Sequence, residues 1–460
     1  MHDKVTAGSR RDIPAVSRVL DALDHYDLPR PLIVDLIRRE LSKVRAKAET
    51  PEFESIVDLV RGSIEQLRAS RLQPVINGTG IVIHTNFGRA PLAADAIRAL
   101  IETGSTYSNL EYVLGTSERG GRGNYIEKAL ALLCEAESAT VVNNCAAALV
   151  LIVRHFTGNK PEIVISRGEL IQIGGGFRIG EILEAAGAKL REVGATNKTT
   201  LNDYAKAIGP NTALILKVHR SNFFMSGFVE STSSAAIAAL ARKKRVPFVE
   251  DLGSGAIVAT ERLGIAEHEP TPAEALKDGA DLVCFSGDKL FGGPQAGIIT
   301  GKKRFIAALK REPLFRALRC DKLIFAALQA TVDLHLNQST SEIPAIALLQ
   351  ISERELRARA AAIASRLEGL PLGIAIGRGM VKVGGGTLPK STMCSVTIDI
   401  VPRNCSLVDL AARFRASNPP VIGYIANARF KLDLRTIFPQ QDDAVVDAIR
   451  AACASQNVFR

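Results

Sequence analysis

VPFVEDLGSG (residues 246–255) is an apolar run that ends in an acidic residue and passes at once into a glycine-containing loop. DLVCFSGDK (281–289) has the same form, an apolar run followed by glycine and charge. Four further apolar runs, separated by helical stretches, lie at residues 139–144, 161–166, 212–218 and 296–301. Near-continuous apolar strands that alternate with helices predict an α/β fold with a mostly parallel sheet covered on both faces. Ligands of such sheets bind at the carboxyl ends of the strands.

The pattern along the chain predicts three domains. Residues 1–72 repeat apolar side chains at helical spacing, which predicts a small helical domain of three amphipathic helices broken at Pro31 and Pro51. Residues 73–336 contain the apolar runs and form the large core domain. Period-2 runs at 394–400 and 429–437 bracket a helical stretch, so we expect a smaller α/β domain over residues 337–460.

The composition excludes several classes of protein. The 460 residues are 47% hydrophobic and 23% charged, which rules out a disordered, collagen-like or coiled-coil chain. Apolar runs such as 146–153 are far shorter than the ~20 residues that span a bilayer, and the amino terminus is polar. We therefore expect no membrane segment and a cytoplasmic location. Seven scattered cysteines without a C-x-x-C pair argue against a disulfide framework and a zinc site.

Positive charge is concentrated in one segment of the chain. The net charge is +10, and residues 302–319 carry seven Lys and Arg against one Glu, a net of +6 (7 minus 1). A basic protein is suited to a polyanionic partner, although composition does not say which. For residues 302–311 we expect the ordinary role of a charge run, which is a solvated helix face.

Two strand ends carry the residues that pyridoxal phosphate requires. Asp251 closes one strand, and Lys289 follows another 38 residues later (289 minus 251). A lysine forms the Schiff base with this cofactor, and an aspartate keeps its pyridine nitrogen protonated, so that the ring acts as an electron sink. Either residue alone is more often a helix cap or a solvated side chain, but the pair on one sheet favours a cofactor site.

The cofactor phosphate has a candidate site at the start of a helix. In Asn143-Asn144-Cys145-Ala146 a strand passes into an alanine-rich helix, whose first amides are free to bind an anion. The hydroxyl of Ser286 is a further candidate donor. We expect Cys145 to be a packing residue at the helix start, not a nucleophile.

Longer stretches resemble one enzyme family over nearly the whole chain, about residues 12–454. The sequence is similar to bacterial L-seryl-tRNA(Sec) selenium transferases, the selenocysteine synthases, in INGTGIVIHTNFGRAPL (76–92), SRGELIQIGGGFRIGEI (166–182), FSGDKLFGGPQAG (285–297) and REPLFRALRCDK (311–322). The resemblance implies a fold-type-I pyridoxal phosphate enzyme in which Lys289 forms the Schiff base. It also implies that residues 1–72 dock on tRNA, and that the chain forms a homodecamer, a pentamer of dimers with active sites shared between partners.

The resemblance assigns an anion pocket for the selenium donor, selenophosphate. Its arginines by motif are Arg89, Arg122, Arg316 and Arg319, and guanidinium forks suit a phosphate-like dianion. Arg119 could take the place of Arg122 in the ERGGRG loop. A surface salt-bridge helix is the alternative for Arg316 and Arg319. Cys145 departs from the family pattern, in which a third Asn is expected.

The implied reaction converts L-seryl-tRNA(Sec) to L-selenocysteinyl-tRNA(Sec) by β-elimination to aminoacrylyl-tRNA and addition of selenium from selenophosphate. Lys289 is the expected base at the α-carbon, and Asp251 supports the cofactor ring. His84 and His219 lie at strand ends and could contact the cofactor or be structural. Two alternatives stay open: a small-molecule lyase on the same scaffold, such as an ammonia-lyase of a phosphorylated sugar acid, and a non-catalytic RNA-binding protein.

Overall fold

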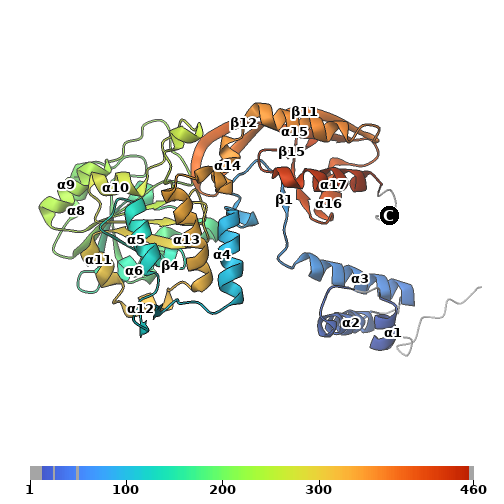
Figure 1. The fold of residues 1–460 in the computed structure, drawn as a ribbon, viewed down its shortest axis with the longest axis horizontal. Coiled ribbons are helices and arrows are strands. Elements are labelled where there is room, and N and C mark those ends of the chain that lie inside the picture. The colour runs from blue at the N-terminus through green and yellow to red at the C-terminus, as the bar shows by residue number, and fades with distance from the viewer. Residues whose placement is uncertain (1–12, 24–25, 48–50, 455–460) are drawn as a thin grey trace, which may run out of the picture. The chain divides into compact units, whose positions relative to one another are not determined.

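The computed structural model describes residues 13–23, 26–47 and 51–454, and the chain divides into two compact units, Met1–Pro74 and Val75–Arg460 (Figure 1). The first unit contains α1 (Val16–Asp21), α2 (Arg30–Arg45) and α3 (Phe53–Ala69), so the three predicted helices are confirmed. Their apolar faces form one core that includes Ile37 and Val60. The predicted break near Pro31 is confirmed: α2 begins at Arg30, and Pro31 lies in its first turn, where its missing N–H is not needed.

The second unit is built on a seven-stranded sheet of order β4-β10-β9-β8-β7-β5-β6. Its strands are β4 (Ser138–Val142), β5 (Glu162–Ser166), β6 (Lys189–Val193), β7 (Thr212–Val218), β8 (Phe248–Gly253), β9 (Leu282–Ser286) and β10 (Gly297–Gly301). Only β10 runs antiparallel to its neighbours, so the predicted mostly parallel α/β sheet is confirmed. β6 was not among the predicted strands, because its charged residues are exposed at the sheet edge.

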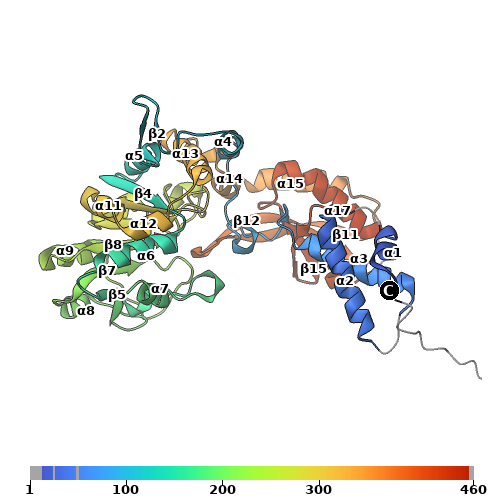
Figure 2. The same ribbon diagram turned by 90° about the horizontal axis from the view of Figure 1, so that it is seen from below.

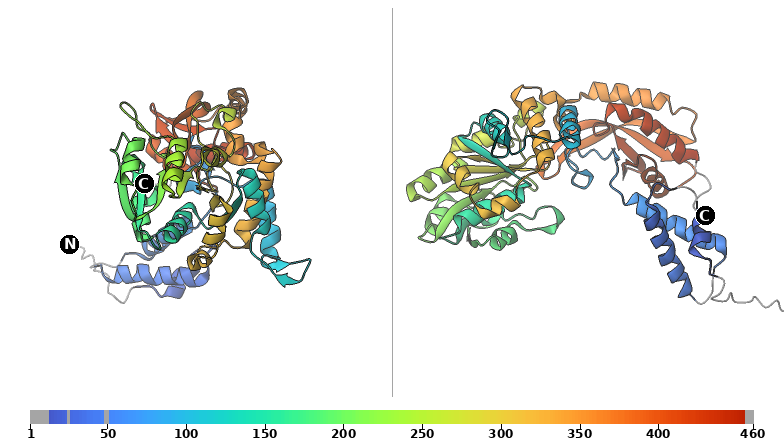
Figure 3. Two further views of the ribbon diagram at one scale, coloured as in Figure 1. Left: turned by 90° about the vertical axis from the view of Figure 1, so that its left-hand side faces the viewer. Right: turned by 60° about the horizontal axis from the view of Figure 1, so that its bottom comes forward.

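Helices cover both faces of this sheet (Figures 2 and 3). Side chains that alternate along the strands, such as Val141 and Val142 of β4, enter two different apolar clusters. One cluster includes α5 (Asn124–Leu133), α8 (Leu201–Ala207), α9 (Ser234–Lys244), α10 (Pro272–Asp278) and α13 (Lys322–Leu336). The other includes α6 (Cys145–Phe156), α7 (Ile179–Ala185), α11 (Lys303–Leu309) and α12 (Pro313–Ala317). Burial on both faces explains why the central strands are rich in apolar residues.

The carboxyl-terminal part contains a four-stranded antiparallel sheet of order β11-β12-β15-β14. Its elements are β11 (Leu372–Gly384), β12 (Thr387–Pro402), β14 (Tyr424–Ala426), β15 (Arg429–Asp433), α15 (Glu353–Ser365), α16 (Leu407–Arg415) and α17 (Asp442–Ala454). The remaining elements of the unit are β1 (Ile76–Asn77), α4 (Ala94–Ser105), β2 (Tyr112–Val113), β3 (Glu118–Arg119), α14 (Pro344–Gln350) and β13 (Val421–Ile422). A separate domain over residues 337–460 stays a prediction, because residues 75–460 form a single compact unit.

The β11–β12 hairpin reaches the core of the second unit. Its tip, residues 384–386, packs against residues 81–83, where the Ile83 N–H donates to the Val383 carbonyl at 2.8 Å. Residues from the carboxyl-terminal sheet therefore lie beside the carboxyl ends of the central strands. Among the described residues, no helix combines the length and apolar character that crossing a bilayer requires.

Candidate active site

A cavity of about 510 Å³ lies at the carboxyl ends of β7, β8 and β9 and at the start of α6. The predicted residues that line it are Arg89, Asn144, Cys145, Ala146, Asp251, Ser286 and Lys289. Asn143 is absent from this lining; it is exposed, and its N–H donates to the Leu318 carbonyl at 3.0 Å. The edge of the sheet at which parallel strands end is thus where the predicted cofactor residues meet.

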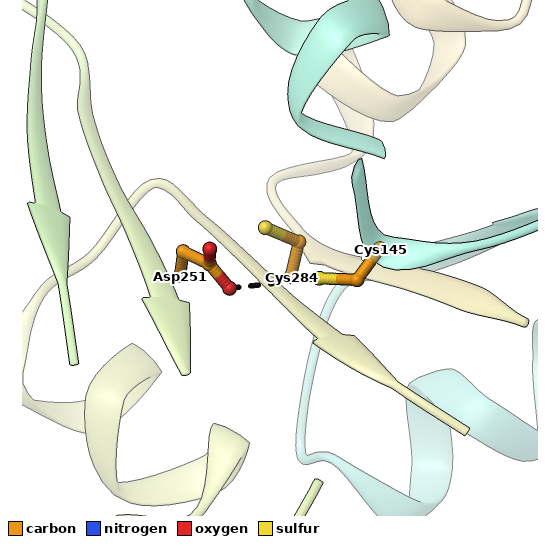
Figure 4. A group of neighbouring side chains, drawn as sticks. All are labelled: Cys145, Asp251 and Cys284. Atoms are coloured by element: carbon orange, nitrogen blue, oxygen red, sulfur yellow. Dashed lines mark hydrogen bonds between the residues drawn. The ribbon is translucent and has the colours of Figure 1, made fainter. Parts of the chain in front are cut away.

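Asp251 is the buried carboxylate of this cavity. It lies at the end of β8, and burial raises its pKa, while the Lys289 ammonium and a hydrogen bond from Cys145 oppose that rise. The Cys145 thiol donates to Oδ1 of Asp251 at 3.5 Å, and Cys284 lies next to both (Figure 4). Cys145 was expected to be a packing residue at the helix start and not a nucleophile, with its amide in the cofactor site; the structure also gives its sulfur a polar contact.

Small residues leave space around the Lys289 ammonium. A side chain at Gly253 would place its Cβ 3.8 Å from Nζ, and one at Gly386, in the hairpin tip, would place it 3.6 Å away. Both glycines have positive φ, 66° and 77°, which side chains rarely adopt. The backbone at Gly253 and Gly386 therefore bounds the cavity beside Lys289 and leaves open space there.

Arg89 is held near Lys289 by an ion pair with Asp288. Its Nη1 is 2.5 Å from Oδ2 of Asp288, the residue before Lys289, and Asp288 is buried. Arg89 lines the cavity and remains 30% exposed. Asp288 thus holds a guanidinium at the cavity wall, where it can meet an anionic substrate group.

The start of α6 provides amide donors. The side chain of Asn144 caps the helix by accepting from the Ala147 N–H at 2.8 Å. The amides of Cys145 and Ala146, in the same first turn, have no acceptor within the helix. Together with the hydroxyl of the buried Ser286, they are hydrogen-bond donors of the kind that suits an anion at the cavity wall.

These residues fit pyridoxal phosphate. The cavity offers an amine for the aldehyde, a buried carboxylate for the ring nitrogen and a helix start for the phosphate. In the described part of the chain, the only cluster of metal-ligand type is Cys145, Asp251 and Cys284, whose ligand atoms lie within 4.8 Å of one another. The carboxylate of this cluster is that of Asp251, which is the group expected to pair with the cofactor ring nitrogen.

The two histidines that the sequence singled out differ in their position relative to the cavity. His219 lines the cavity, its N–H donates to the Asp251 carbonyl at 2.8 Å, and its Nε2 lies 3.2 Å from Oε1 of the buried Glu269. His84 is not in the cavity lining; it stacks on Phe87 with 3.8 Å between ring centroids, and burial lowers its pKa. Of the two histidines, His219 is therefore the one that lines the cavity.

Sequence reasoning missed several cavity residues. Asn222 lines the cavity and donates to the Gln172 carbonyl at 2.7 Å, which ties two loops together. Gly385 and Gly386 come from the β11–β12 hairpin. A turn glycine in a distant hairpin carries no local signal of a binding site, whereas the strand-end position of Asn222, shortly after β7, could have pointed to it.

The predicted arginines occupy two cavities of this chain. Arg122, Arg316 and Arg319 line a separate cavity of about 420 Å³, together with Arg119 and Glu111. Arg89 belongs to the cavity of Lys289. Within one chain the four arginines therefore do not share a pocket. Their meeting in one pocket stays a prediction, for an assembly in which two subunits share an active site.

Comparison with known proteins agrees with this geometry. The model of the L-seryl-tRNA selenium transferase family matches residues 75–438. A protein named L-seryl-tRNA(Sec) selenium transferase from Carboxydothermus hydrogenoformans is 42% identical, with 94% of this chain and 95% of the relative covered. A protein of the same name from Geobacter sulfurreducens is 40% identical, with 95% and 98% covered.

A solved structure shares the fold. D-glucosaminate-6-phosphate ammonia-lyase is 20% identical and superimposes with a TM-score of 0.58, covering 85% of this chain and 97% of its own. The likeness confirms the predicted fold class, and at this identity it carries no information about the substrate.

Proposed function

This chain belongs to the L-seryl-tRNA selenium transferase family, and from that membership we propose that it converts L-seryl-tRNA(Sec) to L-selenocysteinyl-tRNA(Sec) with pyridoxal phosphate as cofactor. The observation that carries the proposal is the meeting of Asp251 and Lys289 in one cavity at the strand ends. Because its substrate is an aminoacylated tRNA, we place the enzyme in the cytoplasm.

Each cavity residue has a role in this reaction. Lys289, Asp251, Ser286 and the first amides of α6 would hold pyridoxal phosphate, which supplies an electron sink when bound. Nζ of Lys289 takes the proton from the α-carbon of the seryl group and returns it after selenium has added. The carboxylate of Asp251, close to Lys289, would pair with the cationic ring nitrogen of the bound cofactor.

Selenophosphate is the proposed selenium donor, and the arginines are its proposed site. Arg89 lies at the cofactor cavity, and Arg122, Arg316 and Arg319 line the second cavity. We propose that a homodimer brings the second cavity of one subunit to the cofactor cavity of its partner, within a decamer of five dimers. Exposed apolar side chains near the second cavity, including Leu114 at 73%, support a contact there between copies.

The first unit is the proposed tRNA-binding part. α2 carries five basic residues against two acidic ones. Arg38 and Arg45, seven positions apart and therefore on one face, are exposed and have no ion-pair partner among the residues that the structure describes. Free guanidinium groups on one helix face suit the phosphates of RNA.

The small-molecule lyase is not favoured. The ammonia-lyase shares the fold at 20% identity, whereas the selenium transferases match 94–95% of this chain at 40–42% identity. An enzyme for a small sugar acid would also have little use for a helical first unit with a cationic face.

The test is a reaction with defined substrates. The purified protein should form selenocysteinyl-tRNA from seryl-tRNA(Sec) and selenophosphate, and should leave seryl-tRNA(Ser) and free serine unchanged. Lys289→Ala should lose this activity and the visible absorption of the bound cofactor, whereas Lys243→Ala, an exposed lysine on α9, should keep both. Release of ammonia from a phosphorylated amino sugar acid, without reaction of the tRNA, would favour the lyase instead.

A further inference from the structure

Three arginines of the second cavity share one carboxylate, that of Glu111. Nε of Arg122 donates to Oε1, Nη2 of Arg119 donates to Oε2 at 2.8 Å, and Nη1 of Arg319 lies 3.7 Å from Oε1. The hydrogen bonds from Arg122 and then Arg119 hold the pKa of Glu111 below its ordinary value. The carboxylate is therefore ionised at neutral pH and sits where an anionic ligand would sit.

The other carboxylates of this cavity are already paired. Glu127 lies 2.6 Å from the Lys310 ammonium, and Glu312 lies 2.6 Å from Nδ1 of His155. Glu111 is thus left as the counter-ion for the arginines. One carboxylate cannot neutralise three guanidinium groups, so the cavity keeps an excess of positive charge.

Two observations show that the arginines are not satisfied by Glu111. Nε of Arg319 is buried and has no hydrogen-bond partner among the residues that the structure describes. Arg316 is exposed, lines the same cavity and has no ion-pair partner within the described ranges. Buried guanidinium N–H groups are costly to leave unpaired, which points to a ligand with more acceptor oxygens than Glu111 offers.

We propose that Glu111 is an internal counter-anion that a dianion must displace from Arg119 and Arg319 in order to bind. This inference rests on the proposed function, in which this cavity receives the selenium donor. Arg122 stays in place during the exchange, because its Nη1 also donates to the Cys320 carbonyl at 3.2 Å. A singly charged anion gains too little to replace a carboxylate of equal charge, so Glu111 selects for dianions.

Arg119 and Arg122, the two arginines of the ERGGRG loop, have different roles in this exchange. Arg122 has two protein acceptors and is 27% exposed, so it is a positioning residue that fixes Glu111. Arg119 is 77% exposed, and within the described part of the chain Glu111 is its only acceptor. Arg119 is therefore the arginine that is free to move from the carboxylate to an incoming dianion.

The test compares anion binding by the assembled holoenzyme and its Glu111→Gln variant. Inorganic phosphate and thiophosphate are titrated by calorimetry, with nitrate as a monoanionic competitor. The variant should bind phosphate about tenfold more tightly, as expected when a unit charge beside a dianion is removed in a water-exposed cavity. Nitrate should compete better in the variant than in the unmodified enzyme, because the selection against monoanions is lost.

Matched controls keep the result interpretable. Glu118→Gln removes the same charge from the same hairpin, but Glu118 is exposed and lies outside the cavity lining, so phosphate affinity should change less than twofold. If Glu111→Gln does not fold, Glu111→Ala carries the same expectation. Unchanged or weaker phosphate binding in the variant would overturn the proposal and make Glu111 a scaffold for the arginines.

Turnover of seryl-tRNA(Sec) is measured in parallel. If the unmodified enzyme turns over seryl-tRNA(Sec) but the Glu111→Gln variant does not bind phosphate more tightly, only the proposed role of Glu111 is overturned. Absence of turnover in the unmodified enzyme would instead overturn the proposed function.

Discussion

The thiol of Cys145 donates a hydrogen bond to Oδ1 of Asp251, which joins the first residue of α6 to the end of β8 across 3.5 Å. One contact thereby connects the proposed phosphate site with the carboxylate proposed for the ring nitrogen. Separately, hydrogen bonding to Cys145, burial and the charge of Asp251 raise the pKa of Cys284. The thiol therefore influences the pKa of Asp251 without taking part in bond making or bond breaking.

Removing this hydrogen bond should weaken cofactor binding. In Cys145→Ala, Asp251 loses a donor that opposes the effect of burial, so its pKa should rise and its pairing with a cationic ring should weaken. A thiol is a weak donor, so its loss corresponds to roughly 0.5–1.5 kcal/mol, or about 2–12-fold in affinity for pyridoxal phosphate. Titration of the apoenzyme by absorbance measures it. Cys145→Ser keeps a donor and should bind normally; equal loss in both variants would contradict this role.

Arg316 and Arg319 should serve the donor and not the tRNA. Replacing both with Ala removes two charged hydrogen-bonding groups, each contributing roughly 1.5–3 kcal/mol, so affinity for thiophosphate should fall at least about a hundredfold. The affinity for tRNA should stay the same. The control is Arg304→Ala with Arg311→Ala, which removes two positive charges from the same basic segment. A shift of the tRNA titration, with an unchanged thiophosphate titration, would assign these arginines to RNA.

The exposed face of α2 should bind the RNA backbone. Arg38→Ala combined with Arg45→Ala should weaken tRNA binding and lower the slope of log affinity against log salt by up to about two, since each phosphate contact contributes about one. Cofactor content should not change. Arg68→Ala, on α3 and paired with Glu65 at 3.3 Å, is the control. An unaltered salt slope in the double variant would place the RNA contact elsewhere.

Glu169 should make stability depend on pH. Burial raises its pKa to about 7, although the Val218 N–H donates to it at 3.1 Å and Lys217 lies nearby. The folded state then keeps a proton that an unfolded glutamate loses near pH ~4.3, so stability should fall as pH rises from there to about 7, by on the order of 3 kcal/mol. Glu169→Gln should flatten this dependence and raise the apparent thermal midpoint at pH 8. A parallel pH profile in both proteins would show that Glu169 ionises normally.

The sequence was most informative where a strand is buried on both faces. β7, β8 and β9 each contain a run of buried apolar residues, so their ends, and with them Asp251 and Lys289, could be located without a structure. β6 was missed because only Val193 of its five residues is buried. Local patterns also could not show that Arg89 and Arg319 lie in different cavities, since this depends on long-range packing.

The hairpin tip beside Lys289 has a consequence for biosynthesis. Gly386 is made 97 residues after Lys289 (386 minus 289), and it lines the same cavity. A nascent chain on the ribosome can thus complete the central sheet while its cofactor cavity still lacks one wall. Prematurely terminated chains that end before β12 should therefore leave the lysine open to solvent, and only polypeptides translated past the hairpin can retain the cofactor in a closed cavity.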